Sequence, residues 1–130
     1  MRTVLIVDDS ASIRAIVGFT LRTADFAVIE ACDGQDALKK LDSAAVDLIL
    51  TDLNMPVMDG LALIQRLRAR PATRFTPILV LTTENQLEKK MRGKGAGATG
   101  WIVKPVQPDT LIGVIAKVLP IRRQSPCASI

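Results

Sequence analysis

Four short apolar runs in this sequence end abruptly at polar residues, and this pattern limits the possible folds more than any other feature. The runs, each with the polar residues that follow it, are Val4–Val7 with Asp8 and Asp9, Leu48–Leu50 with Thr51 and Asp52, Ile78–Leu81 with Thr82 and Thr83, and Trp101–Val103 with Lys104. Runs of this length are typical of strands buried on both faces, as in parallel sheets. Ligands of open α/β sheets bind beyond the carboxyl ends of the strands. We therefore expect three carboxylates, a hydroxyl and an ammonium group to converge at one edge of one sheet.

Strand-like runs alternate with helical patterns along the chain. The predicted strands lie near residues 3–7, 26–31, 47–51, 78–82 and 100–103. The predicted helices begin after Ser10 or Ser12, after Asp33-Gly34 and after Asp59-Gly60, and the last two lie near 86–95 and 108–119. In the first helix, the positions expected to face inward are Ile13, Ile16, Val17, Thr20 and Leu21. This alternation predicts a doubly wound α/β fold, with five parallel strands and helices on both faces of the sheet.

The length and composition fit one small domain. The chain has 130 residues, of which 48% are hydrophobic, and this is enough for a single core. It has no apolar run near the ~20 residues that span a bilayer, and its N-terminus lacks a signal-peptide layout. Cys32 and Cys127 are too few for a disulfide framework or a zinc motif. We expect a domain over residues 1–120, a short flexible tail over 121–130, and a cytoplasmic protein with reduced thiols.

The absence of histidine narrows the chemistry. With no histidine in the chain, a Ser-His-Asp triad, a histidine-ligated metal and an internal phosphohistidine are all excluded. A phosphoryl group that comes from a histidine must therefore come from another molecule. The net charge of +4 is modest and only 3% of the residues are aromatic, so we expect solvated helix faces and no nucleic-acid site.

The carboxylates at the predicted sheet edge require a positive partner. Asp8, Asp9 and Asp52 would repel one another, and buried carboxylates without compensation are costly. Lys104 supplies one positive charge, and a set of oxygen ligands favours Mg²⁺ as the source of more. A carboxylate in such a site can attack a phosphoryl group. Lys104 would then stabilise the charge on the transferred group, and the Thr82 hydroxyl could donate a hydrogen bond to it.

These residues resemble the receiver domain of two-component response regulators, most closely the stand-alone CheY-like type. The resemblance covers residues 2–119 and rests on five elements in the order that the family has. They are Val7-Asp8-Asp9-Ser10, Thr51-Asp52-Leu53-Asn54-Met55-Pro56, Asp59-Gly60, Thr82, and Trp101-Ile102-Val103-Lys104-Pro105.

The resemblance implies a fold and a set of residue roles. The fold would be flavodoxin-like, with strand order 2-1-3-4-5, five helices and a cis bond before Pro105. Asp52 would accept the phosphoryl group from a histidine kinase. Asp9, Asp52 and the Asn54 carbonyl would ligate Mg²⁺, while Asp8 would act through a bound water. Lys104 and Thr82 would contact the phosphoryl group.

The resemblance also implies how the signal leaves the domain. Thr82 and Trp101 would act as the switch that remodels the face made of helix 4, strand 5 and helix 5. In the sequence itself, Ile112 and Val114 lie off the inward stripe of the last predicted helix, so we expect them to add apolar surface there for a partner. The resemblance suggests a flagellar motor switch or another effector as that partner. Asn54 and Glu84 would tune dephosphorylation, on which a phosphatase could also act. We expect a monomer, and a phosphoacceptor that assists its own phosphorylation and dephosphorylation and is not otherwise an enzyme. Thr83 replaces a small residue of the family and would narrow access to the phosphoryl group.

Several alternatives remain open from the sequence. Within the family, chemotaxis is favoured, but a phosphorelay intermediate or a phosphate sink would share the same core site. A metal-dependent phosphohydrolase usually has a second acidic residue two places after the nucleophile, where Asn54 stands here. A flavin or nucleotide binder would present hydroxyls and N–H groups to phosphate, whereas Asp8 and Asp9 would repel it.

Overall fold

The computed structural model describes residues 2–53, 55, 57–83, 95 and 97–119, and its centre is a parallel sheet. The strands are β1 (Thr3–Val7), β2 (Ala27–Ala31), β3 (Leu48–Asp52), β4 (Ile78–Thr82) and β5 (Gly100–Val103). They are hydrogen-bonded in the order β2-β1-β3-β4-β5, and every pair is parallel. This arrangement confirms the predicted flavodoxin-like fold and its strand order.

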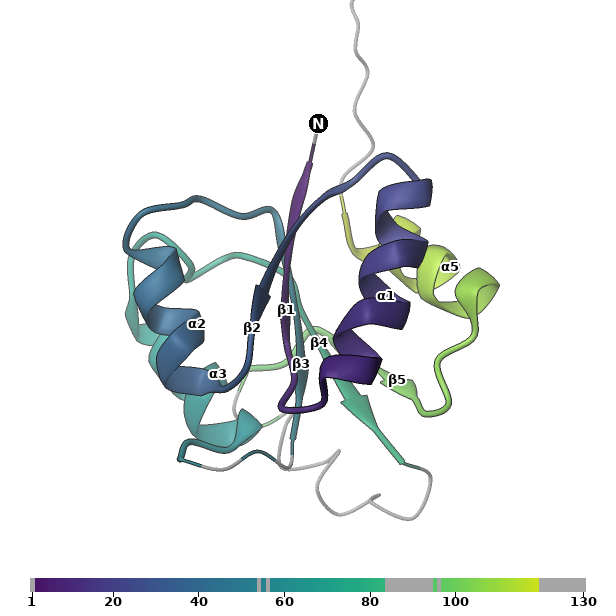
Figure 1. The fold of residues 1–130 in the computed structure, drawn as a ribbon. Coiled ribbons are helices and arrows are strands. Elements are labelled where there is room, and N and C mark those ends of the chain that lie inside the picture. The colour runs from purple at the N-terminus through teal and green to yellow at the C-terminus, as the bar shows by residue number, and fades with distance from the viewer. Residues whose placement is uncertain (1, 54, 56, 84–94, 96, 120–130) are drawn as a thin grey trace, which may run out of the picture.

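Helices cover both faces of the sheet (Figure 1). They are α1 (Ala11–Thr23), α2 (Gly34–Leu41), α3 (Gly60–Ala69) and α5 (Pro108–Val118). α1 and α5 lie on one face, and α2 and α3 lie on the other (Figure 1). The helix predicted near 86–95, apart from Gly95, and the predicted tail over 121–130 lie outside the described residues. No described helix is long and apolar enough to cross a membrane.

The strands are apolar throughout because they are covered on both faces. Successive side chains of a strand point to opposite faces, and β1 divides accordingly. Val4 and Ile6 pack with Val17 and Leu21 of α1 and with residues of α5. Leu5 and Val7 pack with residues of α2 and α3 on the opposite face. The continuous apolar runs of the sequence therefore supply two core layers at once.

Three helices begin at the carboxyl edge of the sheet with a side-chain cap. Ser10, Asp33 and Asp59 each accept a hydrogen bond from the backbone N–H three residues later, at 3.3, 2.8 and 2.8 Å. Ser10, not Ser12, is therefore the cap of α1. A cap of this kind contributes about 1 kcal/mol to stability. These caps fix where the chain leaves the sheet edge and thus where the loops of that edge run.

One expectation about an apolar side chain was wrong. Ile16 was expected to face inward, but it is 57% exposed, and α1 buries Val17, Gly18 and Leu21 instead. Ile16 is exposed because a groove of about 610 Å³ separates part of α1 from the start of α5. Ile112 and Val114, expected to add apolar surface for a partner, are both half-buried against the core, and Ile112 lines that groove; their role in partner binding stays a prediction.

Candidate functional site

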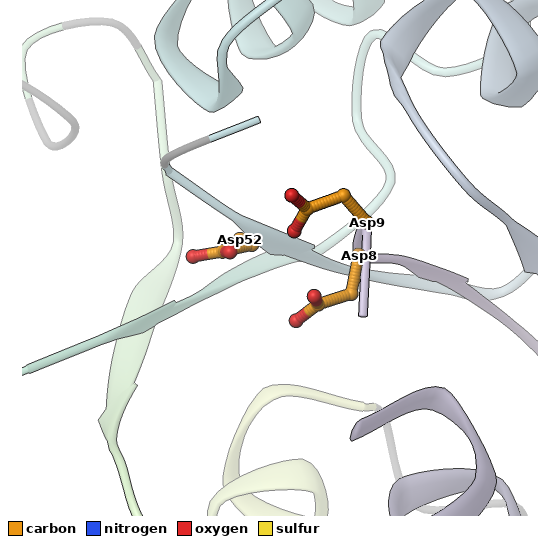
Figure 2. Close-up of side chains that lie close together, drawn as sticks. All are labelled: Asp8, Asp9 and Asp52. Atoms are coloured by element: carbon orange, nitrogen blue, oxygen red, sulfur yellow. The ribbon is translucent and has the colours of Figure 1, made fainter. Parts of the chain in front are cut away.

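The carboxyl ends of the central strands bring the predicted polar residues together. Asp52 is the last residue of β3, and Asp8 and Asp9 directly follow β1. Because β1 pairs with β3 with Val7 opposite Thr51, the next residues of both strands are neighbours. In Figure 2 the side chains of Asp8, Asp9 and Asp52 gather around one space. One carboxylate oxygen from each lies within 4.8 Å of the others.

Two of the three carboxylates are withdrawn from solvent. Asp8 is 1% exposed and Asp52 is 6% exposed, whereas Asp9 is exposed. Burial raises the pKa of the Asp8 carboxyl, and the neighbouring charge of Asp52 adds to this rise. The backbone N–H of Ser10 donates to Asp8 Oδ1 at 2.9 Å and partly offsets the rise in pKa. The site thus concentrates negative charge in a place where water can compensate little of it.

Lys104 brings one positive charge to these carboxylates. Its Nζ lies 3.4 Å from Asp52 Oδ1 and 3.7 Å from Asp8 Oδ2. Lys104 directly follows β5, its backbone N–H donates to the Thr82 carbonyl at 2.6 Å, and the bond to Pro105 is cis, as expected. Among the described residues, one ammonium group thus faces three carboxylates, which leaves an excess of negative charge.

The donor set fits a hard divalent cation. Among the buried side-chain oxygen and nitrogen atoms of the described residues, Asp8 Oδ2 is the one without a hydrogen-bond partner. This atom lies in a cluster whose side-chain donors are all carboxylate oxygens. Mg²⁺ prefers oxygen ligands, one or two of them carboxylates, and retains several waters. The orphaned oxygen and the excess negative charge are what such an ion would compensate.

The backbone after β3 holds Asp52 in place. The N–H of Leu53 donates to Asp52 Oδ1 at 2.8 Å. Gly60 N–H donates to the Leu53 carbonyl at 2.9 Å, which closes the loop between β3 and α3. A Cβ atom at Gly60 would lie 2.3 Å from the Asp52 carbonyl oxygen, so only glycine fits this close approach. The Asp59-Gly60 pair therefore serves the geometry of the loop and the cap of α3.

Two other predicted residues, Thr82 and Trp101, lie in the strands β4 and β5. Thr82 is 1% exposed at the end of β4, and its hydroxyl donates to the Thr83 carbonyl at a long 3.4 Å. Trp101 is half-buried against the α2–α3 side of the core. Asn54 and Glu84, expected to tune dephosphorylation, lie outside the described residues.

One residue near the site was missed from the sequence. The Arg14 guanidinium donates to the Asp8 backbone carbonyl at 2.7 Å and pairs with Glu30 at 3.2 Å. It thereby connects the end of β1 to α1 and β2. The sequence could have indicated this contact, because Arg14 follows the Ser10 cap by four residues. One turn of helix therefore brings its side chain back over the loop between β1 and α1.

Residues 4–116 match the family described as the response regulator receiver domain. The chain belongs to this family. One similar solved structure is that of the chemotaxis response regulator CheY4 of Vibrio cholerae. It matches this chain with a TM-score of 0.87 and 50% sequence identity, over 92% of this chain and 99% of that one. Another is the receiver domain of the sensor histidine kinase PA1611 from Pseudomonas aeruginosa PAO1, with a magnesium ion coordinated in its active-site cleft. It has a TM-score of 0.83 and 25% identity, over 90% of this chain and 96% of that one.

Longer regulators contain similar domains. The phosphate regulon transcriptional regulatory protein PhoB of Escherichia coli (strain K12) is 37% identical over 98% of this chain and 55% of its own length. A gliding motility regulatory protein of Myxococcus xanthus is 42% identical over 78% of this chain, but over only 13% of its own. The chain thus spans about half, or less, of the length of these curated relatives. What the chain shares with them is a CheY-like receiver domain of a two-component response regulator. Domains of this family are phosphoacceptors that interact with histidine kinases and downstream effectors.

Proposed function

We propose that Asp52 accepts a phosphoryl group from the phosphohistidine of a histidine kinase. The observation that carries this proposal is a buried carboxylate at the end of a central strand, with the Lys104 ammonium 3.4 Å away and two more carboxylates beside it. In the transfer, an Asp52 carboxylate oxygen forms a bond to phosphorus as the bond between phosphorus and the histidine nitrogen breaks. The imidazole keeps the electron pair of the broken bond and takes up a proton, and Asp52 becomes an acyl phosphate.

Asp8, Asp9 and Asp52 are the residues that would hold Mg²⁺, with the backbone carbonyl of Asn54 as a further ligand. When bound, this ion would neutralise charge on the phosphoryl oxygens and on the carboxylates. Lys104 would contribute a second positive charge to the same oxygens, because its Nζ already lies between Asp8 and Asp52. Thr82 is buried at the adjacent strand end, from which its hydroxyl could donate a hydrogen bond.

The phosphorylated site would signal through the β5 side of the sheet. Lys104 follows β5, and Trp101 lies within the same strand. A phosphoryl group that draws in Thr82 and Lys104 would therefore move two neighbouring strand ends and, with them, the surroundings of Trp101. The expected output is the binding of a partner protein by the face that includes β5 and α5.

Chemotaxis is the output that we favour, because the similar CheY4 is a chemotaxis response regulator. A phosphorelay intermediate or a phosphate sink would use the same site and would differ only in the partner. The phosphohydrolase alternative is weaker because Asn54, an amide, stands where a general acid is needed.

The first test is phosphoryl uptake from a small donor. Wild-type protein incubated with acetyl phosphate and Mg²⁺ should gain the mass of one phosphoryl group, and the adduct should be lost in alkali as an acyl phosphate must be. The same incubation with excess chelator should give little or no adduct. A protein that instead releases phosphate steadily from small phosphomonoesters would support the phosphohydrolase alternative.

A second test separates phosphoryl uptake from signalling. Lys104→Ala should still accept phosphate at Asp52, more slowly than wild type, because Lys104 neither attacks nor holds the metal. It should lose most of the change in Trp101 emission that beryllofluoride and Mg²⁺ produce in the wild type. Trp101 is the only tryptophan and the chain has no tyrosine, so the emission reports this region alone.

Lys117→Ala is the matched control, since Lys117 is an exposed lysine of α5. Its emission change should equal that of the wild type. Equal changes in Lys104→Ala and wild type would mean that Lys104 does not couple the phosphate to β5.

A further inference from the structure

Val57 has a backbone conformation that its side chain disfavours. Its φ is +70°, in the left-handed region that glycine and asparagine enter readily and β-branched residues avoid. The side chain is also 71% exposed, so no burial of the valine compensates for this conformation. Asp25 shares a positive φ of 69°, but a short polar side chain tolerates it. Among the described residues, Val57 alone combines a positive φ with an exposed apolar side chain.

The three residues that follow Val57 are each held in place. Met58, the next residue, packs so closely on Gly34 that a Cβ there would lie 2.8 Å from its sulfur. Asp59 caps α3 through the Ala62 N–H. Gly60 is fixed against Asp52 and Leu53 by its hydrogen bond and its close approach. Strained residues persist where the structure around them leaves no alternative, and they concentrate at functional sites.

The position of Val57 relates it to the site. It follows Asp52 by five residues, in the loop that begins at the phosphoacceptor and ends at the α3 cap. Loops at the carboxyl edge of a parallel sheet surround the ligand site. A protein that carries a phosphohistidine must bring its imidazole to Asp52, and its surface then covers part of this rim. A small phosphodonor reaches Asp52 without covering the rim.

We propose that Val57 is a docking contact for the phosphohistidine-bearing protein and that the loop holds its apolar side chain outward for that contact. The proposal rests on the proposed function of Asp52. Burial of a valine side chain at the interface corresponds to about a tenfold gain in affinity. Val57 therefore raises the efficiency of phosphoryl transfer from a protein donor and has no effect on uptake from acetyl phosphate.

Three substitutions separate the apolar contact from the backbone strain. Val57→Thr keeps the branched shape and the strain but replaces a methyl group by a hydroxyl. Val57→Asn removes the apolar surface and also relieves the strain, so its Tm should rise by about 3 °C. Val57→Ile keeps both the apolar surface and the backbone strain. The donor protein is the purified, phosphorylated histidine kinase that labels wild type fastest in a panel of such kinases.

With this kinase, kcat/KM for transfer should fall about tenfold in Val57→Thr and Val57→Asn and stay near wild type in Val57→Ile. Labelling by acetyl phosphate should be equal in all four proteins. Phe75→Ser is the matched control, because Phe75 is 88% exposed just before β4, at the opposite edge of the sheet. It should transfer like wild type.

Wild-type transfer rates in both polar variants would overturn the proposal. A loss in Val57→Asn alone would also overturn it, because backbone geometry and not the apolar contact would then be responsible. Failure of acetyl phosphate to label even the wild type would instead contradict the proposed function itself.

Discussion

Asp52→Asn should abolish phosphoryl uptake. The substitution keeps the shape of the side chain and an oxygen that can accept the Leu53 N–H, which lies 2.8 Å from Asp52 Oδ1 in the wild type. It removes the carboxylate that would attack phosphorus, so incubation with acetyl phosphate and Mg²⁺ should give no mass gain. Removing one negative charge from a cluster of three carboxylates, two of them buried, should at the same time leave the fold at least as stable.

Asp59→Asn is the matched control for this experiment. It makes the same chemical change in the same loop, but asparagine caps a helix about as well as aspartate does. Its uptake should equal that of the wild type. An adduct on a serine or threonine, stable in alkali, would show that Asp52 was the wrong assignment, as would a normal mass gain in Asp52→Asn.

The sheet was predictable because burial on both faces leaves a strong signal in a strand. Residues 78–82 and 100–103 were predicted as strands, and β4 and β5 have these same bounds. In β1, Val4 and Leu5 enter opposite core layers, so both had to be apolar. The convergence of Asp8 and Asp52 followed from the same pattern, since parallel strands end at one edge.

Side-chain exposure on the helices was less predictable because it depends on how neighbouring helices are placed. Ile16 fits the periodicity of an inward stripe as well as Val17 does. It is exposed because α1 and α5 do not close over it, and no local pattern records their separation. Ile112, on the facing helix, lines the same groove and is half-buried because it also packs against the core.

The contacts of individual charged atoms in the site could not be predicted from the sequence either. That three carboxylates need a cation could be predicted from their charge. The sequence could not predict which carboxylate oxygen lacks a hydrogen-bond partner. The two oxygens of Asp8 differ: Oδ1 accepts the Ser10 N–H, while Oδ2 lies 3.7 Å from Lys104. The contact of Arg14 with the Asp8 carbonyl likewise depends on the angle at which α1 leaves the sheet. The roles assigned to Asn54 and Glu84, and the division between domain and tail, remain predictions.

Asp9→Ala should abolish the response of the protein to Mg²⁺. Asp9 is exposed, so its loss should not destabilise the fold, yet its carboxylate is one of three that converge on the candidate metal position. A Mg²⁺ titration should change Trp101 emission in the wild type and not in the variant. Labelling by acetyl phosphate should fall by about two orders of magnitude or more, as expected when a metal no longer offsets charge in phosphoryl transfer.

The pH dependence and a control complete this test. Burial raises the pKa of Asp8, so protons compete with Mg²⁺ for this carboxylate, and the wild-type affinity for Mg²⁺ should fall as the pH is lowered. Asp42→Ala should titrate like the wild type, because Asp42 is an exposed aspartate that pairs with Arg70 at the end of α2. If Asp9→Ala is labelled at the wild-type rate in the presence of chelator, uptake by this domain needs no divalent ion. Lys104 would then be the group that offsets charge on the phosphoryl oxygens, since its ammonium lies 3.4 Å from Asp52 Oδ1 and 3.7 Å from Asp8 Oδ2.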